Sequence, residues 1–149
     1  MEQTLSDPEK LFPPKTPVYF TATSRGIDGV YSTQASPHPF PTTVDESGGG
    51  FDNSTGKYTA PKSGIYFFAF SLERDDNSSR KSTSAALLKN EVVICHAFDE
   101  IDTGSLEHML GCSATISVKK DDILYIKLIQ GQTWQSVDEA STFTGFLLN

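Results

Sequence analysis

Apolar and polar residues alternate in short runs along this chain, and the longest apolar run spans residues 64–72. β-Branched and aromatic residues dominate this run, and Pro61 and Gly64 punctuate its start, which favours a strand over a helix. Large apolar side chains stand at both odd and even positions, and successive side chains of a strand point to opposite faces. We therefore expect this strand to be buried on both faces.

Further short runs of the same kind predict other strands, with turns rich in Gly, Pro, Asn and Ser between them. The run 84–95 is either one strand or a pair joined by a turn at Lys89-Asn90. No stretch keeps a 3.6-residue period over three turns, so the sequence predicts an all-β sandwich or jelly roll of eight to ten strands. The other runs are 18–23, 42–44, 57–59, 112–118, 123–129 and 142–148, and the expected connections include 26–41, 74–82, 96–111 and 131–140.

Two of these strands, 64–72 and 123–129, are apolar on both faces. In a lone two-layer sandwich only one face of each sheet meets the core. Each large side chain left in water would forgo about 1.5–3 kcal/mol, and soluble monomers rarely expose a patch of this size. The pattern therefore predicts that one face of this sheet lies in the core and the other in a subunit interface.

Length and charge narrow the class of protein. A chain of 149 residues suffices for one domain, and we expect a flexible N-terminal lead over residues 1–16 and a globular domain over 17–149. The net charge of −7 disfavours nucleic acid and anionic membranes as partners, and the longest apolar run is too short to span a membrane. The first residues lack a signal-peptide pattern, so either the protein is not classically exported or the sequence is a mature region.

A ladder of mostly aromatic residues at fixed spacing covers most of the chain. It continues to the last strand, where Phe143, Gly145 and Phe146 lie in the run 141–148. This pattern resembles the globular-head domain of complement C1q, within the C1q and tumour necrosis factor superfamily. Two residues depart from the family pattern: Glu46 stands where Asn or Asp is usual, and Tyr58 where Phe is usual. The ladder consists of Phe40, Glu46, Phe51, Tyr58, Gly64, Tyr66, Phe68 and Phe70.

The resemblance implies a ten-stranded jelly-roll β-sandwich that assembles as a compact trimer about a three-fold axis, either a homotrimer or a heterotrimer with relatives. The alternation in the central strand then divides its residues between two environments. We expect the trimer interface to hold Ile65, Phe67 and Phe146. We expect the core to hold Phe51, Tyr58, Tyr66, Phe68, Phe70 and Phe143.

For function, the resemblance implies a secreted trimeric recognition module that binds glycans, microbial surface ligands or proteins in innate immunity, in the manner of a lectin. The alternative is a trimeric signalling or adhesion ligand for a cell-surface receptor, or an extracellular structural protein. Fold alone does not choose among these.

Catalytic motifs fail on spacing, which predicts a protein without enzymatic activity. The glycines of Ser47–Gly50 and the pair Gly56-Lys57 do not have phosphate-loop spacing, and Tyr58 stands where Ser or Thr is needed. The three histidines, His38, His96 and His108, share no i, i+4 spacing, and no nucleophile-elbow motif occurs.

The two cysteines, Cys95 and Cys112, flank the acidic connection. They form a disulfide across a hairpin, which would contribute about 3 kcal/mol in the chain-entropy model, or they are two buried thiols that act as small hydrophobes. Zinc binding by Cys95, Cys112 and His96 is a weaker alternative, because structural zinc usually takes four ligands.

The connection 96–111 carries a cluster of carboxylates. The plain interpretation is a solvated acidic loop. The resemblance instead implies a calcium site near the three-fold axis, with Asp99 as the leading ligand, since calcium suits clustered oxygen ligands. The candidate ligands are Asp99, Glu100, Asp102 and Glu107.

Three further polar-loop residues are candidates for recognition or modification. Trp134 is the single tryptophan, and it either stacks on a sugar or anchors a partner, or simply packs. Asn53 and Asn77 begin Asn-x-Ser/Thr triplets, so both are glycan acceptors if the chain is exported.

Overall fold

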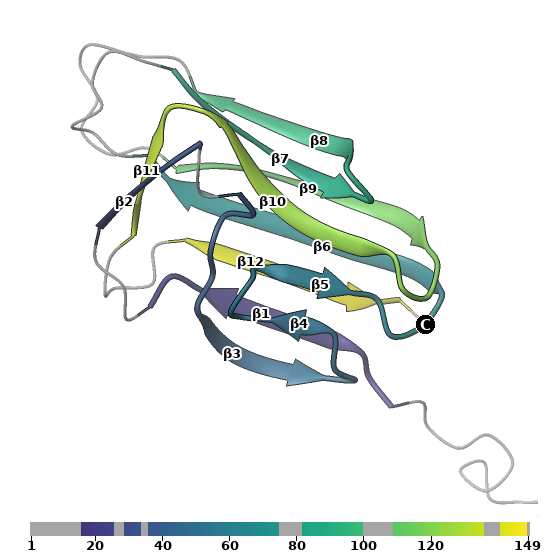
Figure 1. The fold of residues 1–149 in the computed structure, drawn as a ribbon. Helices are drawn as coiled ribbons and strands as arrows, with labels where there is room; N and C mark the ends of the chain where they lie inside the picture. The colour runs from purple at the N-terminus through teal and green to yellow at the C-terminus, as the bar shows by residue number, and fades with distance from the viewer. Residues whose placement is uncertain are drawn as a thin grey trace, which may run out of the picture.

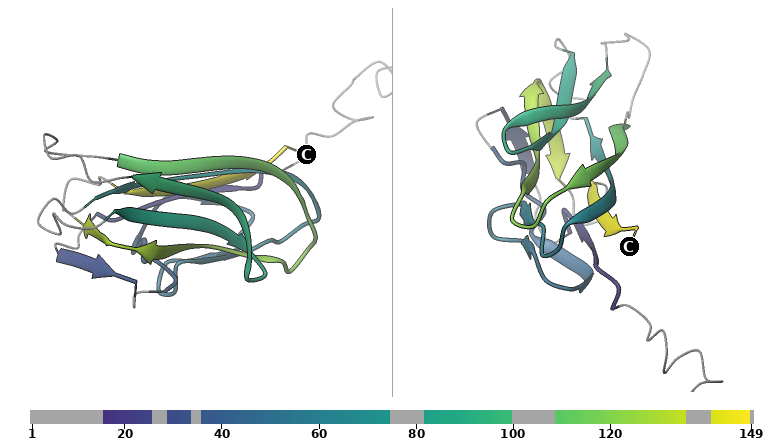
Figure 2. Two further views of the ribbon diagram at one scale, coloured as in Figure 1. Left: turned by 90° about the horizontal axis from the view of Figure 1, so that it is seen from above. Right: turned by 90° about the vertical axis from the view of Figure 1, so that its right-hand side faces the viewer.

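The computed structural model describes residues 16–25, 29–33, 36–74, 82–99, 109–135 and 141–148. Its strands form two antiparallel five-stranded sheets that face each other across one core (Figures 1 and 2). The first sheet has the order β3 (Thr42–Ser47), β1 (Tyr19–Thr23), β12 (Thr142–Leu147), β6 (Gly64–Glu73), β9 (Met109–Val118). The second has the order β4 (Phe51–Asp52), β5 (Lys57–Thr59), β10 (Ile123–Gln130), β7 (Thr83–Lys89), β8 (Val92–Asp99).

The ten strands of these two sheets confirm the predicted all-β jelly roll. The described residues also contain a separate two-stranded ribbon, formed by β2 (Gly29–Ser32) and β11 (Gln132–Gln135). Nothing in the described part of the chain is a helix with the length and hydropathy of a membrane span. The predicted N-terminal lead lies outside the described residues, apart from residue 16.

The central strand β6 follows the predicted alternation. Tyr66, Phe68 and Phe70 are buried, whereas Ile65 and Phe67 on the opposite face are only partly covered. β6 pairs with β12 and β9 along its length. Opposite Phe68, β12 carries Gly145, where an added Cβ would lie 2.5 Å from the Phe68 ring. A glycine at this position therefore lets the aromatic side chains of the core approach the backbone.

Stacked aromatic rings fill the core at the level of β6. The Phe20 ring stacks on Phe51 and Tyr58 with centroids 4.9 and 4.4 Å apart, and it meets Phe143 edge-on at 4.9 Å. Such offset and edge-on geometries are the favoured aromatic arrangements. All six side chains expected in the core are buried in the structure.

Of the two alternatives for the run 84–95, the structure shows a pair of strands joined by a turn and not one continuous strand. β7 and β8 are joined at Asn90 and Glu91, which have φ values of 49° and 69°. Positive φ at both central residues is typical of hairpin turns whose twist matches the flanking strands. The Asn90 side chain also bonds across to the next turn, with Nδ2 donating to Asp122 Oδ1 at 2.8 Å.

Three of the expected connections proved shorter than predicted. The segment 26–41 contains β2, 131–140 contains β11, and β8 and β9 extend into 96–111. β2 and β11 pair with each other, with Tyr31 opposite Thr133. Pairing supplies backbone hydrogen bonds to segments that have too few apolar residues to show alternation. The sequence pattern therefore missed both strands.

Candidate functional site

An apolar patch lies on the outer face of the first sheet. Ile65 and Phe67 of β6 point away from the core, and Phe146 of β12 pairs with Phe67. The Phe67 and Phe146 ring centroids lie 5.4 Å apart. Ile65 and Phe146 are 44% and 41% exposed. The three residues predicted for a subunit interface thus form one surface, which we call the outer apolar patch.

A hollow of about 410 Å³ adjoins this patch, over the paired strands β1 and β12. It is lined by residues 17–21 and 144–147. Tyr19 belongs to its wall, and its hydroxyl donates to Asp45 Oδ2 at 3.2 Å. The outer apolar patch therefore continues into a concave surface that can accept a side chain.

Small hydroxyl residues occupy much of the remaining outer face. Thr21 and Thr144 lie opposite each other, with their hydroxyl oxygens 2.9 Å apart. On β9 the register places Ser113, Thr115 and Ser117 opposite Ala69, Phe67 and Ile65, and all three are exposed. Short uncharged side chains leave the backbone of this face accessible to close packing.

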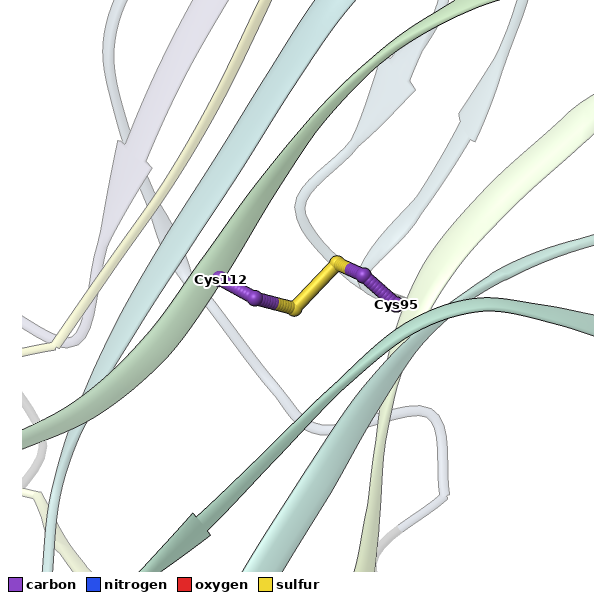
Figure 3. Close-up of a disulfide and its surroundings, with 2 residues drawn as sticks. All are labelled: Cys95 and Cys112. Atoms are coloured by element: carbon purple, nitrogen blue, oxygen red, sulfur yellow. A yellow bond between two sulfur atoms is a disulfide. The ribbon is translucent and has the colours of Figure 1, made fainter.

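A disulfide ties the edge strands of the two sheets together. Cys95 of β8 and Cys112 of β9 are bonded, with Cα atoms 6.3 Å apart (Figure 3). Both lie at the margin of the core. Of the interpretations left open, the structure supports the disulfide. The zinc alternative with His96 is wrong in this form, because zinc binds thiolates and neither sulfur is one.

Beside the disulfide, the edge strand β8 exposes a second group of apolar side chains, which we call the lateral apolar edge. It comprises Val92, Val93 and Phe98, each more than half exposed. The outer apolar patch belongs to the first sheet and the lateral apolar edge to the second. One chain therefore presents two distinct apolar surfaces.

Buried polar side chains gather at the end of the sandwich where β6 ends and where β7 and β12 begin, away from the labelled C-terminus (Figure 1). We call this the apical end. Ser24 and Ser141 bond each other there, with Ser24 N donating to Ser141 O at 3.1 Å. The buried polar residues are Thr23, Ser24, His38, Arg74, Thr83, Ser84, Thr133 and Ser141.

An ion pair at the apical end involves the leading candidate for calcium binding. Arg74 Nη1 lies 3.3 Å from Asp99 Oδ2, and the two side chains are 6% and 18% exposed. The guanidinium already neutralises the carboxylate. The described residues hold no group of three His, Cys, Asp or Glu that could bind a metal. Glu100, Asp102 and Glu107 lie outside the described residues, so the calcium site stays a prediction.

His38 links the ribbon to the sandwich. Its backbone N–H donates to Ile126 O of β10 at 2.7 Å, and its Nε2 lies 2.8 Å from Thr133 Oγ1 of β11. Its Nδ1 lies 3.1 Å from Pro39 O. Since a carbonyl only accepts, Nδ1 carries the proton and Nε2 accepts from Thr133. Burial lowers the pKa of His38 to about 4.

We expect the stability of this domain to fall as the pH drops from about 6.5 to about 4. The unfolded chain takes up a proton on His38 near pH 6.5, whereas the folded chain resists it until about pH 4. The free energy of unfolding should therefore lose on the order of 3 kcal/mol from this group. Urea unfolding at stepped pH measures it. The slope should flatten in His38→Gln but persist in His96→Gln, which alters an exposed histidine; equal slopes in both variants would contradict the assignment.

The remaining recognition candidates are placed only in part. Trp134 lies on β11 with its backbone opposite Val30, and its side chain is outside the described part. Asn53 is exposed in the turn between β4 and β5. Asn77 lies outside the described residues.

The environments of Glu46 and Tyr58, the two residues that depart from the family pattern, were not evident in the sequence. Glu46 Oε1 accepts a hydrogen bond from Phe51 N at 3.2 Å, which closes the glycine turn between them. The Tyr58 hydroxyl is buried and has no hydrogen bond of ordinary geometry to the described residues, and burial, together with the neighbouring Tyr66 hydroxyl, raises its pKa. The tyrosine at position 58 therefore places a polar atom inside the aromatic core.

Comparisons with known proteins agree with this geometry. A family model described as the C1q domain matches residues 19–148. Complement C1q tumor necrosis factor-related protein 3 of Homo sapiens is 28% identical over 139 residues, which cover 91% of this chain and 53% of that protein. Complement C1q and tumor necrosis factor-related protein 9B of Homo sapiens is 28% identical over 102 residues, which cover 66% of this chain and 29% of that protein. The chain spans about half the length, or less, of these curated relatives.

Solved structures share the fold. The globular domain of zebrafish complement 1qA protein has a TM-score of 0.69 at 18% identity, covering 89% of this chain and 98% of that chain. The Eiger TNF structure from S. frugiperda has a TM-score of 0.73 at 12% identity, covering 91% and 94%. At these identities the likeness concerns architecture alone.

Proposed function

The chain belongs to the C1q domain family, and on this premise we propose that it is a secreted, trimeric, non-enzymatic module that binds a protein partner. Lectin-like recognition of glycans in innate immunity is the competing outcome. The single observation that carries the assembly is the presence of two different exposed apolar surfaces on one chain, the outer apolar patch and the lateral apolar edge.

The two surfaces favour a cyclic assembly over a two-fold dimer. A two-fold interface uses the same surface on both subunits, whereas a ring joins one surface of each subunit to a different surface of the next. Packing the lateral apolar edge of one protomer against the outer apolar patch of its neighbour uses both. Three copies close such a ring in the arrangement that the family resemblance implies.

The disulfide supports an extracellular location. Stable disulfides form in oxidising compartments and are rare in the cytosol, and Cys95 and Cys112 are bonded to each other. The bond joins strands from both sheets, so it stabilises the domain as a whole.

Charge and the apical contacts support a protein partner over a polyanion. The net charge of −7 repels polyanions. At the apical end, Arg74 is already paired with Asp99. A cationic side chain that would attract an anionic glycan there is therefore already engaged.

Binding assays in calcium and in chelator test the proposed function. We expect saturable binding of the purified trimer to a cell-surface protein, which protease treatment of the cells abolishes, and a flat response on a glycan array. Glycan binding that requires calcium would overturn the protein-partner proposal and favour the lectin-like alternative. A thermal unfolding midpoint that is equal in calcium and in chelator would contradict the predicted calcium site.

A further inference from the structure

The turn between β4 and β5 presents an Asn-Ser-Thr triplet at the surface. Asn53, Ser54 and Thr55 are all exposed, as is Asp52 before them. The following residue, Gly56, is buried with φ of 80°, and a Cβ there would lie 2.6 Å from His38 O. The triplet therefore projects outward from a turn whose base is packed against the domain.

The amide of Asn53 contributes little to holding this turn. Its Nδ2 lies 3.4 Å from Thr43 Oγ1, at the limit of a hydrogen bond. Asp52 supplies the stronger contacts, because its Oδ1 accepts from Ser54 N at 2.9 Å and from Ser54 Oγ at 2.6 Å. Its carbonyl also accepts from Gly56 N at 2.8 Å. A substituent on Asn53 Nδ2 can thus be accommodated without loss of the turn.

The turn lies on the side of the sandwich opposite the disulfide. β3 and β4 are edge strands of the first and second sheets, and β9 and β8 are the other two edges. Val44 of β3 is 60% exposed on this side. Open edges pair readily with other chains unless something blocks them. A bulky group on Asn53 would shield this side and leave the lateral apolar edge uncovered.

We propose that Asn53 is an N-glycosylation site whose glycan caps the β3–β4 edge; this rests on the proposed secretion. In the transfer, a bond forms between Asn53 Nδ2 and the anomeric carbon of a lipid-linked oligosaccharide. The bond from that carbon to the pyrophosphate oxygen breaks, the lipid pyrophosphate leaves, and Nδ2 loses one proton. No oxidation or reduction takes place.

Single substitutions within the triplet distinguish the loss of the glycan from a disruption of the turn. The protein is secreted from eukaryotic cells behind a supplied signal peptide, and the peptide containing Asn53 is analysed by mass spectrometry before and after N-glycosidase treatment. Thr55→Ala should abolish the sugar, whereas Thr55→Ser and Ser54→Ala keep the acceptor triplet and the sugar. Ser54→Ala is the matched control, because both hydroxyls bond Asp52.

The outcomes distinguish this proposal from the proposed assembly. A secreted trimer with unmodified Asn53 overturns the glycan alone, whereas a glycosylated monomer overturns the assembly alone. Ser113→Asn creates an acceptor triplet with Ala114 and Thr115 on the outer face, and a glycan there should prevent trimer formation while one on Asn53 does not. If enzymatic removal of the Asn53 glycan leaves the rate of aggregation on heating unchanged, the capping role is wrong.

Discussion

The Phe67→Asp variant is expected to sediment as a monomer under conditions in which the unmodified protein sediments as a trimer. Phe67 lies in the middle of the outer apolar patch and packs against Phe146. Burying a large apolar side chain is worth about 1.5–3 kcal/mol, and three copies would lose this contact at once. The substitution also places an unpaired carboxylate in a dry interface, which costs several kcal/mol more. Analytical ultracentrifugation over a range of concentrations measures the effect.

Two isoleucines of similar exposure provide the matched control. Ile65 in the outer apolar patch is 44% exposed, and Ile129 on the second sheet is 42% exposed. Ile65→Asp should weaken the trimer, whereas Ile129→Asp should leave it intact. An intact trimer in Phe67→Asp would show that the outer face of the first sheet is not the interface. Equal dissociation by both isoleucine variants would show a general effect of the added charge.

Replacing Cys95 or Cys112 by Ser should lower the free energy of unfolding by about 3 kcal/mol, because the bond closes a short loop in the unfolded chain. The two residues are separated by 17 positions. Since the disulfide joins the edges of both sheets, its loss should also loosen the lateral apolar edge and weaken the trimer. Urea unfolding measures the first effect and sedimentation the second.

Reduction of the unmodified protein is the control for this pair of variants. A reductant should bring its unfolding midpoint close to that of Cys95→Ser, and the double variant should be no less stable than either single variant, because both remove one bond. Unchanged midpoints in the single variants would contradict a stabilising role for the disulfide.

Alternation in the central strand was predictable because it is local. Tyr66, Phe68 and Phe70 point one way and Ile65 and Phe67 the other by the geometry of any strand, and the structure places the first group in the core. The aromatic ladder indicated the fold because its aromatic residues form the core. Its residues carry large apolar areas whose burial dominates the folding free energy.

Contacts between distant segments were not predictable in this way. The β2–β11 ribbon forms between segments about 100 residues apart, neither of which shows an apolar pattern. Asp99 appeared to be a free acidic ligand in the sequence, and the fold pairs it with Arg74. Whether a polar side chain is available to a ligand depends on partners that other strands bring to it.

The sequence by itself determined the all-β class, the family resemblance, the core face of β6 and the apolar character of its second face, since these follow from side-chain period and apolar area. Only the tertiary structure decided that Cys95 and Cys112 are bonded, that Arg74 neutralises Asp99, and that His38 is buried against Thr133. Each of these depends on strand order and register, which bring together residues that are far apart along the chain and that no local pattern pairs.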